Sequence, residues 1–307
     1  SPDEIMKKFG IDILRLWVVA SDYYDDLKLD NAILNSQTDS YRRIRNTFRY
    51  LIGNLDGFKE TERVDIEKFP ELEKYILHRL WEINEIIKKC ISEFNFHLMF
   101  KTLLNFCSND LSSFYFDIRK DTIYCDNFKL LKRRSARTLL DILFNSLIRW
   151  FAPLLIFTCE EAWQSIGNNS SIHLEEFLNI EDNFKNDKIA QKWKIIKNVR
   201  KVITGALEKK RAEKFIGSSL EASIDVYVSS EIKLQLYDVD LAEIAITSSA
   251  TVFEKDNFSK GFSIQEINDV LVDVKISTGK KCNRCWKILN EVTSTHNVCN
   301  RCVDFVK

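Results

Sequence analysis

The stretch Asn31-Ala-Ile-Leu-Asn-Ser-Gln-Thr-Asp-Ser-Tyr-Arg-Arg-Ile-Arg-Asn-Thr-Phe-Arg-Tyr-Leu-Ile-Gly-Asn-Leu55 carries the pattern that decides the fold. Its apolar residues recur at steps of three, four or seven, the spacing of one helix face: Leu34, Tyr41, Ile44, Phe48, Leu51 and Leu55. Arg42, Arg45 and Arg49 recur at steps of three and four on a neighbouring face. The stretch therefore predicts one long helix that packs inward and presents a line of guanidinium groups outward.

The same helical spacing returns along the next hundred residues. It predicts helices over 71–92, 95–115, 128–150 and 154–166, after two short helices over 1–10 and 11–20. A hydrophobic content of 45% with only three prolines and eight glycines fits a packed, mostly helical chain. Antiparallel helices joined by short loops form a bundle. We therefore expect a mainly α protein built on an antiparallel helix bundle.

The pattern changes in the last third of the chain. A basic helix is predicted over 188–214, and Ala222 to Val228 then alternates apolar and polar residues as a half-buried strand does. Weaker strand patterns cover 244–253 and 270–276. We predict four segments: a connecting segment at 1–30, the bundle at 31–187, the basic helix with a small α/β unit at 188–278, and a metal-binding tail at 279–307.

The tail contains two copies of one short motif, Cys282-Asn283-Arg284-Cys285 and Cys299-Asn300-Arg301-Cys302, with thirteen residues between them. Two such pairs suit one tetrahedral zinc ion with zinc–sulfur distances of ~2.3 Å. Protein would fill all four ligand positions, so the predicted zinc is structural, and its binding would supply the folding free energy of a tail poor in apolar residues. Alternatives are His296 in place of one thiol, a pair of disulfides, or a redox-active Cys-x-x-Cys.

The remaining cysteines bear on the compartment. Cys90, Cys107, Cys125 and Cys159 are scattered through apolar helical sequence without pairing spacings, which predicts reduced, buried thiols and a reducing cytoplasmic location. No run of eighteen uncharged apolar residues is present, and the acidic start at Ser1 does not resemble a signal peptide. We therefore expect a cytoplasmic monomer that has no membrane partner.

The formal net charge is zero, but the basic residues are clustered. The clusters are Arg42, Arg43, Arg45 and Arg49; Lys129, Lys132, Arg133, Arg134 and Arg137; Lys192, Lys194, Lys197, Arg200, Lys201, Lys209, Lys210, Arg211 and Lys214; and Lys280, Lys281, Arg284, Lys287 and Arg301. Taken singly, each cluster is consistent with an ordinary solvated helix face. Taken together, they indicate a polyanionic partner, because neutralising phosphates releases counterions and drives binding.

Several stretches together resemble the carboxy-terminal part of bacterial-type isoleucyl-tRNA synthetase, a class I aminoacyl-tRNA synthetase. The stretches are Ser1-Pro-Asp-Glu-Ile5, Asp12-Ile-Leu-Arg-Leu-Trp17, Asp22-Tyr23, Tyr41 to Leu51, Gly53-Asn-Leu55, Asp110 to Asp121, Tyr124-Cys-Asp126, Ala152 to Trp163, Ile216 to Ala222, Cys282-x-x-Cys-Trp286 and Cys299-x-x-Cys302. They run along essentially the whole chain. The family's HIGH and KMSKS motifs, which carry its ATP and aminoacyl-adenylate chemistry, are absent from the 307 residues.

This resemblance implies a fold and a function. The bundle would be the anticodon-binding domain, in a chain that lacks the catalytic and editing sites. The parent protein would be an ATP-dependent ligase that attaches isoleucine to tRNA(Ile) in protein synthesis. ATP and magnesium would bind only in the catalytic part, so we expect this chain alone to be inactive. Its partner would be tRNA(Ile), not DNA.

Such a module binds RNA by placing arginines on phosphates and planar side chains against unpaired bases. The candidate RNA-binding residues are Arg42, Arg45, Asn46 and Arg49 on the bundle helix, and Arg284, Trp286 and Arg301 in the tail. The alternative for Trp286 is packing against the metal site, and for the arginines a solvated or ion-paired surface. Two other functions stay open: a zinc-stabilised helical interaction scaffold that does not bind RNA, and a thiol oxidoreductase.

Overall fold

The computed structural model describes residues 1–22, 26–256, 260–293, 295 and 297–303. Tyr23 and His296, named above, lie outside the described residues. The chain forms two compact units: Ser1–Arg119 with Leu131–Asn186, and Lys120–Leu130 with Asp187–Lys307. None of the helices in the described part of the chain is long and apolar enough to span a membrane. The division into four segments stays a prediction.

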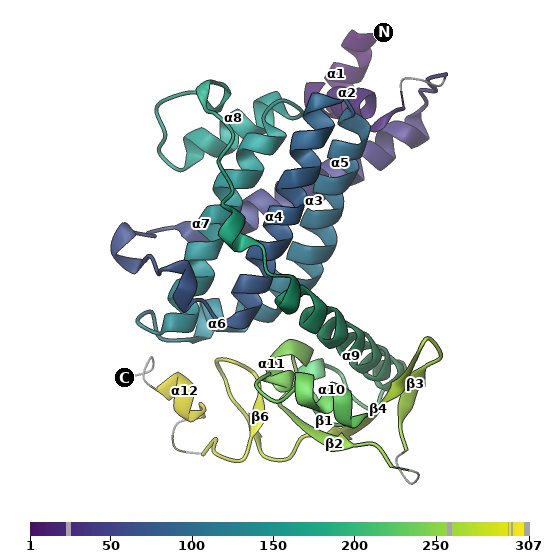
Figure 1. The fold of residues 1–307 in the computed structure, drawn as a ribbon, viewed down its shortest axis with the longest axis vertical. Coiled ribbons are helices and arrows are strands. Elements are labelled where there is room, and N and C mark those ends of the chain that lie inside the picture. The colour runs from purple at the N-terminus through teal and green to yellow at the C-terminus, as the bar shows by residue number, and fades with distance from the viewer. Residues whose placement is uncertain (23–25, 257–259, 294, 296, 304–307) are drawn as a thin grey trace. The chain divides into compact units, whose positions relative to one another are not determined.

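The first unit is a bundle of helices (Figure 1). They are α1 (Pro2–Phe9), α2 (Ile11–Ala20), α3 (Asn31–Leu55), α4 (Glu71–Ser92), α5 (Phe96–Asn105), α7 (Leu131–Phe151) and α8 (Ile156–Ser165). Short 3₁₀ turns at Glu60–Glu62, Ile66–Lys68, Ile172–Leu174 and Asp182–Phe184 lie in the connections. The mainly α fold and the helix bundle are confirmed.

The apolar face predicted on α3 forms part of the bundle core. Ile44, Phe48 and Leu51 are at most 3% exposed. The Phe48 ring meets the rings of Phe144 and Phe151 on α7 edge to face, at centroid distances of 6.2 and 5.8 Å. Because these contacts fix the rotation of α3, the arginines on its other side are held toward solvent.

One predicted helix differs from the structure. The helix that follows Asn95 does not end near Tyr115 but continues through a π-helical segment, η3 (Phe106–Phe116), into α6 (Asp117–Cys125). The wider π turn carries an i→i+5 bonding pattern, which apolar periodicity does not reveal. After Cys125 the side chain of Asn127 accepts a hydrogen bond from the Lys129 N–H, and α7 begins only at Leu131, three residues later than predicted.

A buried polar cluster joins this continuous helix to α4. The Glu73 carboxylate accepts hydrogen bonds from Arg119 Nε and Nη2 at 2.5 and 2.8 Å, and from the Tyr115 hydroxyl at 3.1 Å. Glu73 and Arg119 are 0% and 3% exposed. A charge removed from water in this way is stable only while its partner remains, so the pair fixes how the two helices meet.

The second unit combines one long helix with a four-stranded sheet (Figure 1). Its elements are α9 (Asp187–Ala212), a 3₁₀ turn (Ser219–Glu221), β1 (Ala222–Val228), α10 (Ser230–Gln235), α11 (Leu241–Ala245), β2 (Ser249–Glu254), β3 (Phe262–Ile264), β4 (Ile267–Ile276), β5 (Lys280–Lys281), β6 (Ile288–Leu289) and α12 (Asn300–Val303). The sheet order is β2-β1-β4-β3, with β1 parallel to β2 and antiparallel to β4. α9 packs against β3 and β4.

The strand predicted at 244–253 is half wrong. Ile244 belongs to α11, and the strand begins at Ser249. The Asp240 side chain caps α11 by accepting the Glu243 N–H at 3.0 Å, and Ile246 ends the helix in a left-handed conformation with φ of 56°. Leu241 and Ile244 of this helix turn are both buried, so the hydrophobic pattern alone does not distinguish it from a strand.

Candidate metal centre and nucleic-acid interface

Two short backbone turns, Cys282–Cys285 and Cys299–Cys302, bring the tail cysteines together, and each is called a hook below. The β5–β6 hairpin carries Cys282 and Cys285, and the Cys282 N–H donates to the Lys287 carbonyl at 2.9 Å. The second hook opens α12, where the Cys302 N–H donates to the Cys299 carbonyl at 2.9 Å. Gly279 enters the hairpin with φ of 117°, and a Cβ there would lie 2.4 Å from the Leu289 backbone. Only glycine permits this approach.

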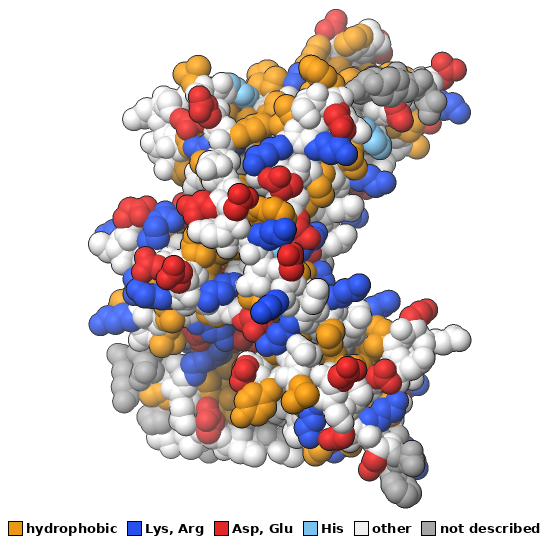
Figure 2. All heavy atoms as spheres, viewed as in Figure 1, with side chains coloured by type: hydrophobic (Ala, Val, Ile, Leu, Met, Phe, Trp, Pro, Cys, Tyr) orange, Lys and Arg blue, Asp and Glu red, His pale blue; other side chains and the backbone are white. Residues whose placement is uncertain are grey.

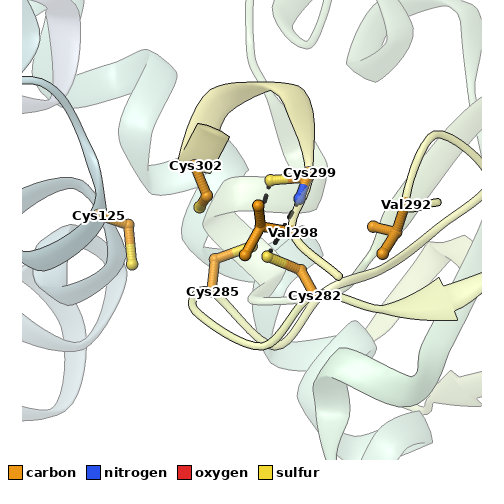
Figure 3. Close-up of a cluster of buried hydrophobic side chains, with 7 residues drawn as sticks. All are labelled: Cys125, Cys282, Cys285, Val292, Val298, Cys299 and Cys302. Carbon is orange, nitrogen blue, oxygen red and sulfur yellow. Dashed lines mark hydrogen bonds between the residues drawn. The ribbon is translucent and has the colours of Figure 1, made fainter. Parts of the chain in front are cut away.

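The four thiols converge on one point (Figure 3). The sulfurs of Cys282, Cys285, Cys299 and Cys302 all lie within 4.8 Å of one another, and all four residues are buried. Four sulfurs placed ~2.3 Å from a common centre lie about 3.8 Å apart along the edges of a tetrahedron. The sulfurs of Cys285 and Cys299 are 3.7 Å apart, far beyond the ~2.05 Å of a disulfide. The four cysteines can therefore hold a metal ion in a site closed by protein.

Backbone amides favour the thiolate form at one ligand. Burial raises the pKa of Cys282, but N–H groups of Cys285, Cys299 and Arg284 outweigh it and lower that pKa to about 6. The Cys299 N–H lies 3.3 Å from the Cys282 sulfur. Burial raises the pKa of Cys285 to about 11. A cation at the centre is the group that would stabilise the remaining thiolates, because metal binding requires deprotonated ligands.

The arginine of each hook binds the end of α6. Arg284 donates to the carbonyls of Cys125 at 2.6 Å and Tyr124 at 2.9 Å. Arg301 forms a bidentate pair with Asp121 at 2.6 and 2.9 Å, and its Nη1 lies 3.2 Å from Asp126. The sequence predicts that both arginines contact RNA, and that role stays a prediction. In this structure both guanidinium groups are committed to protein acceptors.

Sequence reasoning missed the partners of these arginines. Asp121 and Asp126 precede Arg301 by 180 and 175 residues, and nothing in their local pattern marks them as its acceptors. Asp126 is 7% exposed, and the Arg301 cation 3.2 Å away helps to compensate the charge of its carboxylate. Cys125 lies in the same buried cluster as the four ligand cysteines, but its sulfur is not one of the converging four.

We predict that Arg301→Ala loosens the end of α6 without releasing the metal. The change removes the Arg301 cation from the largely buried Asp126 carboxylate and from Asp121, which costs about 1–3 kcal/mol. Amide hydrogen exchange over 120–126 should therefore accelerate, while metal content stays at one equivalent because the cysteines remain. Arg301→Lys keeps a charge but loses the bidentate geometry, so it should give an intermediate rate. Unchanged exchange in Arg301→Ala would contradict the assignment.

The α3 candidates lie on an exposed face of the first unit. Arg42 pairs with Asp39 at 3.2 Å, and Arg45 donates to Glu161 at 3.2 and 3.3 Å. Exposed pairs of this kind stabilise by at most ~1 kcal/mol, so a phosphate can compete for either arginine. The side chains of Asn46 and Arg49 are exposed and make no hydrogen bond or ion pair with any residue that the structure describes. In Figure 2, acidic and basic side chains are interspersed over the helices of this unit.

Trp286 lies at the surface of the tail. It adopts a left-handed backbone with φ of 64°, and its side chain is 60% exposed. The Lys281 ammonium lies 5.8 Å from the centre of its ring. This exposure favours an external contact over packing against the metal centre. Whether the contact is RNA stays a prediction.

Residues 73–227 match a family described as the anticodon-binding domain of tRNA ligase. The chain is 44% identical over 292 residues to the isoleucine–tRNA ligase of Pelagibacter ubique, covering 94% of this chain and 31% of that protein. It is 44% identical over 296 residues to the isoleucine–tRNA ligase of Agrobacterium fabrum, covering 96% and 30%. The chain thus spans about a third of the length of these relatives.

Among solved structures, a LeuRS–tRNA–LeuAMS ternary complex of Agrobacterium radiobacter K84 is similar at a TM-score of 0.47 and 16% identity. The similarity covers 61% of this chain and 21% of that one. A likeness at this level supports no inference about this chain.

Proposed function

Because the chain belongs to the family of anticodon-binding domains of tRNA ligases, we propose that it binds the anticodon stem and loop of tRNA(Ile) as part of an isoleucine–tRNA ligase. The family match over 73–227 carries the proposal, and relatives named isoleucine–tRNA ligase support the choice of amino acid. In the whole protein, ATP and magnesium would serve adenylate formation in a part that this chain lacks. The setting would be the cytoplasm.

In this proposal α3 supplies the contacts to the RNA backbone. Arg42, Arg45 and Arg49 recur on one exposed face, where guanidinium groups can replace weak surface partners by phosphate oxygens. Asn46 lies among them with an exposed amide that can donate to the sugar–phosphate backbone or to a base edge. The arginine contacts fix the position of the RNA on the bundle and carry no base specificity.

The tail cysteines would hold zinc. Tetrahedral coordination by four sulfurs is typical of zinc or of iron–sulfur sites, and two Cys-x-x-Cys hooks around one ion are the usual zinc arrangement. Because protein fills every ligand position, the ion would not bind substrate. Its role would be to hold the tail folded, with Trp286 exposed.

Filter binding with tRNA(Ile) and a control whose anticodon is changed tests the function. Tight binding of tRNA(Ile) that weakens with the anticodon change would support it. The affinity should also fall steeply with salt, with a logarithmic slope of about −0.7 to −0.9 for each phosphate contacted. Salt-independent binding or none would contradict the proposal and favour the interaction scaffold that does not bind RNA.

We predict that Arg42→Ala combined with Arg49→Ala weakens tRNA binding and reduces the magnitude of the salt slope by about 1.4 to 1.8, because each arginine would neutralise one phosphate. Both side chains are exposed, so the fold should be unaffected. Lys101→Ala is the matched control, because Lys101 is an exposed cation on α5 outside this arginine row. An equal loss of affinity in the control would show that the effect reflects total charge and not the α3 face.

A further inference from the structure

The turn that follows α6 exposes aromatic side chains. Tyr124 is 53% exposed and Phe128 is 58% exposed, although both lie within seven residues of Asp121, which pairs with Arg301. Leu130, two residues after Phe128, is 48% exposed. Large apolar side chains gathered in this way on one short segment mark an interaction site more often than isolated ones do.

The backbone that carries these rings is held firmly by the tail. Arg284 binds the carbonyls of Tyr124 and Cys125, and Arg301 binds the carboxylates on either side of them. Since Arg284 lies two residues before Trp286, the same bonds bring the turn to the hook that bears the exposed tryptophan. A turn fixed in advance loses little conformational entropy when a ligand binds, which favours affinity.

The charges around the turn favour an anionic ligand. The Lys129 ammonium lies 5.7 Å from the centre of the Phe128 ring, and Lys281 lies similarly over Trp286. Asp121 and Asp126, the acidic residues of 120–130, are both paired with Arg301, and the nearby Glu243 carboxylate accepts a hydrogen bond from the Thr122 hydroxyl at 3.0 Å. Over 280–303 the sequence has five basic residues and one acidic residue, Glu291, so the neighbouring tail is cationic.

Exposed aromatic rings beside cations are what single-stranded nucleic acid requires, because bases stack on the rings while the cations neutralise phosphates. A purely apolar partner would gain nothing from the lysines. We propose that Tyr124 and Phe128, together with Trp286, form a stacking surface for unpaired bases of the anticodon loop, with Lys129 and Lys281 on the adjacent phosphates. This inference rests on the proposed function. In this inference Arg284 and Arg301 are positioning residues, because they hold the turn that carries the two rings.

Two RNAs test the assignment: a hairpin of the tRNA(Ile) anticodon stem and loop, and a duplex of the same stem without the loop. The full chain should bind the hairpin more tightly. Tyr124→Leu and Phe128→Leu keep an apolar side chain but remove the ring, and each should lower hairpin affinity about 5- to 100-fold while leaving duplex affinity unchanged. Tyr237→Leu is the matched control, because Tyr237 is 87% exposed in the same unit but outside the turn. Metal content should stay at one equivalent throughout.

The outcomes separate the two proposals. If the unmodified chain prefers the hairpin and both leucine variants keep that preference, the stacking surface is wrong while the proposed function stands. If the variants lose affinity for duplex and hairpin equally, the rings do not read unpaired bases and the assignment also fails. If the unmodified chain binds neither RNA, the proposed function itself fails. Loss of hairpin preference in the variants but not in Tyr237→Leu supports the stacking surface.

Discussion

Cys282→Ser is expected to abolish stoichiometric metal binding and to unfold the tail from Lys280 to Val303. Within the described residues, the apolar core of the tail besides its cysteines consists of Leu289, Val292, Val298 and Val303, too little surface to offset the entropy of ordering the chain. Structural zinc sites contribute about 10–16 kcal/mol of apparent binding free energy at pH 7, so in such a segment loss of the metal is loss of the fold. Removal of a residue that only hydrogen-bonds a metal ligand lowers metal affinity roughly 10- to 100-fold. Cys282→Ser removes a ligand itself, so the affinity should fall further.

Metal analysis after gel filtration and limited proteolysis of the tail measure this effect. Cys125→Ser is the matched control: Cys125 is buried in the same cluster but is not one of the four converging thiols, so one equivalent of metal should remain. In Cys282→Ser, Arg284 and Arg301 should also lose their hydrogen bonds to the end of α6. If the tail takes part in recognition, tRNA binding then weakens. Retention of one metal equivalent by Cys282→Ser would exclude the four-cysteine site.

Glu73→Ala is expected to destabilise the helix bundle by about 3–5 kcal/mol, because it removes the buried Glu73 carboxylate that neutralises the buried Arg119 guanidinium. The Tyr115 hydroxyl loses its acceptor in the same step. For a unit of this size the loss corresponds to a fall of roughly 6–20 °C in Tm. Thermal unfolding followed by circular dichroism measures the shift.

A surface glutamate at the end of α4 provides the control for this prediction. Glu93→Ala removes a carboxylate from the residue that ends the same helix, where Glu93 pairs with Lys89 at the surface and such a pair contributes at most ~1 kcal/mol. Glu73→Leu combined with Arg119→Met replaces both charges by apolar groups and should recover most of the stability. If Glu73→Ala shifts Tm no more than Glu93→Ala does, the buried pair does not hold the bundle together.

The spacing of apolar residues predicts secondary structure correctly where the buried residues recur with the period of a helix or of a strand. The spacing of Leu34, Ile44, Phe48 and Leu51 predicted α3 within its observed bounds, and the alternation from Ala222 predicted β1. The pattern failed where a hydrogen bond, and not apolar spacing, sets the local structure. The π-helical segment at Phe106–Phe116 and the cap that makes Leu241–Ala245 a helix are the two examples.

The candidate site likewise has a part that the sequence predicts and a part that it does not. The spacing of Cys282, Cys285, Cys299 and Cys302 by itself indicated that four thiols meet, because two-residue gaps force each pair of sulfurs to one side of a tight turn. Arg42 and Arg301 are chemically alike in sequence, yet one lies exposed beside Asp39 and the other is held by Asp121 and Asp126. No local period encodes that difference, since it depends on residues about 180 positions away. The sequence determined which residues form helices and which can hold a metal; only the tertiary structure decided which cations remain available to a ligand, because a charge is paired or left exposed by whatever the fold brings against it.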